Sequence, residues 1–208
     1  MKMGYRTMGM FCAAAALAIL TAAAAAAQVG KPQGVMDVNS MSETDLSTVP
    51  NFTPAIAKAI AGKRPFTSIT ELHTFLLAQG LTQEQAMAAY QKAFVHINLN
   101  TASSEEILLV PGAGRRMARE FAEYRPWRNY AHFDKEIGKY VGAEATAKLA
   151  QFTFIPMNAN TASDADLMTV PGADQAWVAK VKAGRPYKAA ADVEKALGRA
   201  QARFFVVQ

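Results

Sequence analysis

The sequence predicts an all-α fold of three tandem units, each built from two helix-turn-helix pairs. The first observation behind this prediction is a repeat, in which three landmarks recur 61 and 60 positions apart. The second is that every unit opens with a capped short helix that a proline ends. The third is that no segment of four or more residues alternates apolar and polar side chains strongly enough to require a sheet, although residues 152–156 could extend briefly.

The landmarks are an asparagine, a proline, and a triplet in which arginine and proline precede an aromatic residue. They are Asn39, Asn100 and Asn160; Pro50, Pro111 and Pro171; and Arg64-Pro65-Phe66, Arg125-Pro126-Trp127 and Arg185-Pro186-Tyr187. Self-similarity at a fixed period is the signature of a repeat architecture. The units therefore run over residues 36–97, 98–157 and 158–208, and the third is shortened at its C-terminal end.

Residues 1–27 precede the repeat and have the pattern of a cleavable signal peptide. Lys2 and Arg6 form a basic start, residues 8–27 are apolar and rich in alanine, and Ala25-Ala26-Ala27 precedes Gln28. The alternative is an uncleaved anchor, because about twenty apolar residues can span a bilayer. Cleavage would remove Cys12, the only cysteine, and leave no disulfide framework and no cysteine-based metal site. We expect a periplasmic or secreted protein.

The first half of each unit has the same predicted elements. A serine caps a short helix and has an acidic partner three residues later, a proline ends this helix, and a second helix follows a tight turn. The caps are Ser42, Ser103 and Ser163, and the second helices cover about residues 56–61, 116–124 and 176–183. The Arg-Pro step ends the second helix, because a residue before proline avoids the helical region. We expect the aromatic residue after the proline to fill the core.

The second half of each unit repeats the theme more loosely. Helices are expected over residues 70–77 and 84–94, 132–140 and 144–152, and 190–197 and from there to about 205. A single glycine marks each intervening turn, namely Gly80, Gly142 and Gly198. One unit of this size can barely sustain its own core. The three units should therefore pack on one another or follow one another as closely spaced beads, and the sequence leaves both arrangements open.

The segment with the clearest chemical character begins at the second proline landmark. Gly112, Ala113 and Gly114 form a glycine-containing turn directly before a helix. Glycine lets the backbone approach a ligand closely, and a helix N-terminus offers unpaired N–H groups and a partial positive charge. Arg115, Arg116 and Arg119 follow in the first turns of that helix. These residues can form a phosphate cradle. The alternative is an ordinary turn between packed helices, with solvated arginines.

Residues 98–118 resemble the tandem helix-hairpin-helix module of ComEA-type competence proteins. The resemblance rests on Asn98-Leu99-Asn100-Thr101-Ala102, the acidic pair Glu105-Glu106, an aliphatic run, and Pro111-Gly112-Ala113-Gly114; the rest of residues 28–208 matches more loosely. It implies an all-α fold and sequence-independent contact with DNA phosphates through the N–H groups of the hairpin. It also implies binding of incoming DNA outside the inner membrane during uptake. In the wider family some hairpins hold a monovalent cation through backbone carbonyls.

The pattern carries over unequally to the other two units. In the third unit Asp174 stands where the second unit has Gly114, and a carboxylate there can cap the helix but repels a phosphate. In the first unit Asn51 and Thr53 replace both glycines, and Pro54 removes one N–H group. The intact motif therefore lies in the second unit alone, and the first unit is a degenerate copy.

Charge follows the same asymmetry. The first unit has four basic and five acidic residues, the second eight and seven, and the third seven and five. In the second unit Arg125 and Arg128 extend the basic cluster, and the third unit offers Lys180, Lys182, Arg185 and Lys188. For these residues a solvated helix face is an equally good interpretation.

The sequence predicts a protein that is not an enzyme. His73, His96 and His132 lie in different parts of the repeat without metal-ligand spacing, and no phosphate-binding P-loop or nucleophile motif is present. We expect no catalytic residues, no metal site, no cofactor apart from the monovalent cation that the resemblance allows, and no small-molecule substrate. Two functions remain open: a DNA-binding protein that contacts double-stranded DNA through its phosphates, and an envelope scaffold that binds a protein partner and has lost DNA binding.

Overall fold

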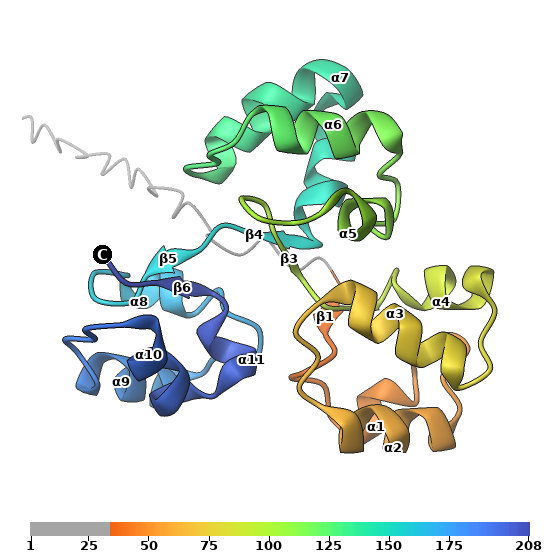
Figure 1. The fold of residues 1–208 in the computed structure, drawn as a ribbon, viewed down its shortest axis with the longest axis horizontal. Coiled ribbons are helices and arrows are strands. Elements are labelled where there is room, and N and C mark those ends of the chain that lie inside the picture. Colours follow the sequence, from red (N-terminus) through yellow and green to blue (C-terminus); the bar gives the residue numbers. More distant parts are fainter. Residues whose placement is uncertain (1–33) are drawn as a thin grey trace, which may run out of the picture.

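The computed structural model describes residues 34–208, and the predicted signal peptide with Cys12 lies outside them. This part of the chain is mostly helical and forms three lobes, each closed by its own pair of strands (Figure 1). The prediction of a helical protein is confirmed in this coarse form. None of the described helices is long and apolar enough to cross a membrane.

The elements of the three units follow one another in the same order. The first unit contains β1 (Met36–Asp37), α1 (Glu43–Leu46), α2 (Pro54–Lys63), α3 (Ile69–Ala78), α4 (Gln83–Ala89) and β2 (Ala93–Phe94). The second contains β3 (Ile97–Asn98), α5 (Ser104–Leu108), α6 (Arg115–Glu123), α7 (Tyr130–Ala150) and β4 (Thr153–Phe154). The third contains β5 (Met157–Asn158), α8 (Asp164–Leu167), α9 (Gln175–Ala183), α10 (Ala190–Leu197), α11 (Arg199–Ala202) and β6 (Phe205–Val206).

The expectation that the fold is purely helical is wrong in one respect. In each unit the first and last segments pair as two-residue parallel strands, with Met36 opposite Ala93, Ile97 opposite Thr153, and Met157 opposite Phe205. Two residues are too few to show the alternation that identifies a strand. Only residues 152–156 hinted at extension, and β4 lies within them.

Positive backbone φ angles mark the two turns of every unit. In the first turns they occur at Asn51, Gly112 and Gly172, with φ of 67°, 85° and 79°. In the second turns Gly80, Gly142 and Gly198 have φ of 92°, 78° and 82°. The φ of Gly142 breaks α7 into two helical parts, so the two helices expected on its sides are present with a sharp bend between them. All six turns thus contain a residue with positive φ, which L-residues other than glycine adopt only at a cost.

The repeat landmarks contact one another inside each unit. The side-chain amide of Asn100 donates to the carbonyl of Trp127 at 3.0 Å, and its oxygen accepts the N–H of the same residue at 2.6 Å. The equivalent pairs Asn39 with Phe66 and Asn160 with Tyr187 make the same reciprocal bonds at 2.8–3.0 Å. These asparagines anchor the loop after α2, α6 or α9 to the start of the unit.

The aromatic landmarks fill the core, as predicted. Phe66, Trp127 and Tyr187 are buried, with exposed fractions of 0%, 1% and 4%. The buried side chains of the first two units form one continuous core, in which the rings of Phe94 and Phe152 meet at 5.1 Å. The third unit has a core of its own. The first and second units therefore pack on each other rather than following one another as separate beads.

Candidate nucleic-acid interface

The turn between α5 and α6 presents its backbone to solvent. Gly112 and Gly114 are exposed, Ala113 is half-buried, and a Cβ atom built on either glycine would meet nothing within 4 Å. Space is therefore not the reason for glycine at position 112, where φ of 85° is the constraint. The N–H of Ala113 donates to the carbonyl of Val110 at 2.9 Å and closes the turn.

The first N–H groups of α6 have no acceptor among the described residues. Gly114 is the N-cap residue and has no side chain to accept from them, and no hydrogen bond from the N–H of Gly114, Arg115 or Arg116 to another described residue is present. These groups point out of the positive end of a nine-residue helix. The result is a set of solvent-facing donors that an anion can satisfy.

In each of the other units a side chain of the corresponding turn accepts one N–H of the helix that follows. In the first unit the hydroxyl of Thr53 accepts the N–H of Ile56 at 3.3 Å, and Pro54 removes a donor. In the third unit the carboxylate of Asp174 accepts the N–H of Trp177 at 2.7 Å. Asn51 has the same positive φ as the glycines at this position of the other units. The first unit therefore keeps the turn conformation but has fewer free N–H groups, because residue 54 is proline.

The three predicted arginines are exposed but differ in their contacts. The guanidinium carbon of Arg116 lies 4.4 Å from the centre of the Tyr140 ring, and its Nε lies 3.8 Å from Oε1 of Glu120. Arg115 and Arg119 form no ion pair with a described residue. Arg116 is thus held in one place by a cation–π contact and a weak ion pair, whereas the other two extend freely into solvent.

Sequence reasoning missed Tyr140, which links the two turns of the second unit. Its hydroxyl lies 2.8 Å from that of Tyr124, and it lies two residues before Gly142. Contact with Tyr124 and burial raise the pKa of Tyr140. Because Arg116 stacks on this ring, the second turn lies beside the first. The signal in the sequence was the aromatic residue just before the second glycine turn.

Arg125 and Arg185 do not belong to the candidate interface, which corrects the clusters inferred from the sequence. Arg125 donates from Nε to the carbonyl of Leu99 at 2.8 Å and from Nη2 to that of Ala102 at 2.5 Å. Arg185 makes the equivalent bonds to the carbonyls of Ala159 and Ala162. Both guanidinium groups tie the end of the second helix to the start of their unit, so their role is structural.

The three histidines lie apart from one another. His73 hydrogen-bonds through Nδ1 to the Tyr90 hydroxyl at 2.8 Å, His132 packs on the Trp127 ring, and His96 is buried beside Asp37. Among the described residues no group of three or more His, Cys, Asp or Glu side chains could hold a metal ion. A monovalent cation at the glycine turn would therefore need backbone carbonyls, and that of Val110 already accepts one hydrogen bond.

No protein-family model matches the chain, no curated protein matches it, and no solved structure matches it.

Proposed function

We propose that this chain is an exported protein of the ComEA-type tandem helix-hairpin-helix class, which binds double-stranded DNA without reading its sequence. The observation that carries the proposal is the exposed turn at Gly112–Gly114, whose following N–H groups lack acceptors among the described residues and are flanked by three arginines. Export is supported by the signal-peptide pattern of residues 1–27. DNA uptake is the setting that the family resemblance suggests.

The donors at this turn fit a phosphate group. Backbone N–H groups at the start of α6 would hold one phosphate, while Arg115 and Arg119 would pair with the same or a neighbouring phosphate. Arg116, stacked on Tyr140, would supply positive charge at a fixed position. Contacts of this kind set the position of the protein on the duplex and carry no sequence information.

Salt dependence and charge reversal test the proposal together. With roughly three to five phosphates contacted, the slope of log affinity against log salt should be about −3 to −5. Replacing Arg115, Arg116 and Arg119 together by Glu should abolish the electrophoretic shift of duplex DNA while leaving the circular-dichroism melting curve intact.

A matched control separates the site from overall charge. Replacing Lys92, Lys188 and Lys195 by Glu changes the net charge by the same amount at exposed positions away from the turn. This control should weaken binding only slightly. Equal loss of binding in both triple variants would contradict a specific site at the turn.

The second candidate is an envelope scaffold that binds a protein, and the side-chain caps of Thr53 and Asp174 in the first and third units favour it. Recovery of one stoichiometric protein from an envelope extract, together with no retention of duplex DNA at low salt, would support the scaffold over DNA binding.

A further inference from the structure

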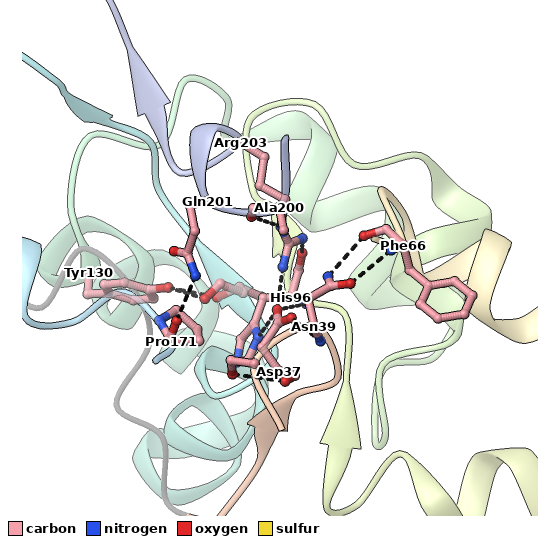
Figure 2. Close-up of polar contacts among 11 residues, drawn as sticks. Asp37, Asn39, Phe66, His96, Tyr130, Pro171, Ala200, Gln201 and Arg203 are labelled. Atoms are coloured by element: carbon pink, nitrogen blue, oxygen red, sulfur yellow. Dashed lines mark hydrogen bonds and ion pairs between the residues drawn. The ribbon is translucent and has the colours of Figure 1, made fainter. Parts of the chain in front are cut away.

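A buried polar cluster joins three distant parts of the chain (Figure 2). Asp37 comes from β1, His96 from the segment between the first and second units, and Arg203 from the residues after α11. Nδ1 of His96 lies 3.0 Å from Oδ2 of Asp37, and Arg203 donates from Nη1 to the carbonyl of His96 at 2.7 Å. Nη2 of Arg203 also forms an ion pair with Oδ2 of Asp37. The Asp37 and His96 side chains are 2% and 1% exposed.

The repeat shows that this cluster is an addition to the common fold. Asp37 stands where the other units have Asn98 and Asn158, and in all three cases Oδ1 accepts the N–H two residues later at 2.9–3.0 Å. Arg203 stands where the other units have Gln91 and Gln151, two residues before the last strand. Opposite charges thus replace neutral residues at the two repeat positions that meet between the first and third units.

The first turn of the third unit lies against the first unit at the same place. A Cβ atom built on Gly172 would come within 3.0 Å of the Cβ of Ser40, whereas one on the equivalent Gly112 would meet nothing within 4 Å. Ser40, His96 and Gly172 line a narrow cleft of about 160 Å³ between the two units. Gly172 therefore lies against the first unit and Gly112 has no such neighbour, although both glycines remain exposed on the rest of their surface.

We propose that the first turn of the third unit is an intramolecular docking element, and that the surface around Asp37 and Ser40 is its partner. A charged pair in a buried position is favourable only when both members are in place, so it specifies this one arrangement of the units. The Arg203 guanidinium also packs on the Phe204 and Phe154 rings, at 4.6 and 5.6 Å. The first and second units share one core, so docking of the third unit on the first makes the three units one body.

Cysteine pairs test the docking directly, in a chain with Cys12→Ala so that no other cysteine remains. Ser40→Cys with Gly172→Cys places two Cβ atoms 3.0 Å apart if the units dock, so a small shift brings them to the roughly 3.5–4.5 Å separation of a disulfide. Ser40→Cys with Gly112→Cys is the control, because both replaced glycines have positive φ. We expect the first pair to form an intramolecular disulfide at least about tenfold faster, since docking raises the effective concentration. Equal rates would overturn the proposal.

The charges of Asp37 and Arg203 are tested by replacing each residue with the one that stands at the equivalent position of another unit, where the fold already accommodates it. Asp37→Asn keeps the turn that Asn98 and Asn158 make, and Arg203→Gln restores the residue type of Gln91. Each single change should lower the crosslinking rate of the first pair and increase the radius of gyration measured by small-angle X-ray scattering. The double change should lower thermal stability by less than the sum of the singles. Unchanged crosslinking and scattering in all three variants would show that these charges do not hold the units together.

Discussion

Replacing Gly114 by Asp should improve the fold and impair DNA binding at the same time. The backbone at Gly114 is extended, with φ of −97° and ψ of −178°, so any residue fits there, and a Cβ atom would have open space. The change would reproduce the third unit, where Asp174 accepts the N–H of Trp177 at 2.7 Å. It would therefore cap the N–H of Met117 and place a carboxylate beside the donors that the proposed function assigns to a phosphate.

The two effects have opposite signs and can be estimated. A capping carboxylate in place of glycine gains a few tenths of a kcal/mol as a cap, and its charge at the positive end of α6 brings the total to about 0.5–1 kcal/mol. For a chain of this size the melting temperature should rise by about 1–4 °C. A carboxylate about 4 Å from a phosphate costs about 1–4 kcal/mol near a protein surface, so DNA affinity should fall about tenfold or more.

Calorimetry and a fluorescence-anisotropy titration with duplex DNA measure the two effects on one protein sample. Gly114→Asn is the control, because asparagine caps as well as aspartate without the charge, and it should give an intermediate loss of affinity. If Gly114→Asp melts higher and binds duplex DNA as tightly as the unchanged chain, the turn is not the phosphate site and the reasoning is refuted.

Four further outcomes follow from the structure. Asn100→Ala removes both hydrogen bonds to Trp127 and should lower the free energy of unfolding, measured by chemical denaturation, by about 2–3 kcal/mol. A decrease of less than about 0.5 kcal/mol would contradict the anchoring role of Asn100. Gly112→Ala should lower the free energy of unfolding by about 1–2 kcal/mol, because residue 112 has a φ of 85°. An unchanged melting temperature would show that the turn can adopt another backbone conformation. Arg125→Ala should destabilise the fold while leaving the DNA affinity of the folded protein unchanged, and a loss of affinity equal to that of the triple variant would return this residue to the interface. Burial opposes ionisation of Asp37, yet Arg203 and His96 hold its pKa well below its ordinary value. The contribution of Asp37 to the free energy of unfolding is therefore present above about pH 4 and is lost as the pH falls further. Asp37→Asn should reduce this loss of stability at acid pH, and an unchanged dependence of stability on pH would contradict the pairing.

The helices and turns were accessible from sequence because their signals are local. Capping serines, prolines and single glycines lie within a few residues of the backbone they control, and Ser42, Ser103 and Ser163 are indeed N-caps. Six of the seven positive φ angles among the described residues lie at the predicted turns, and only that of Asn51 is not at a glycine.

The features that sequence reasoning missed depend on contacts between distant residues. The two-residue strands pair the start of a unit with its end, and the stacking of Arg116 on Tyr140 joins α6 to α7. Arg125 and Arg128 look alike in the sequence, but only the three-dimensional structure shows that the first is committed to backbone carbonyls. Asp37 and Arg203 form an ion pair although they lie near opposite ends of the described residues, so no local sequence pattern could predict it.

The backbone amides of the open turn provide the most direct test of the central claim. In a nitrogen-15 NMR titration with a short duplex, the amide signals of Gly114, Arg115 and Arg116 should shift downfield and saturate with the DNA, as expected for N–H groups that gain a phosphate acceptor. The equivalent amide signals of Thr53 and Ala55 in the first unit, and of residues 174–176 in the third, should stay in place. Shifts spread evenly over the three turns, or confined to the first and third, would contradict the account.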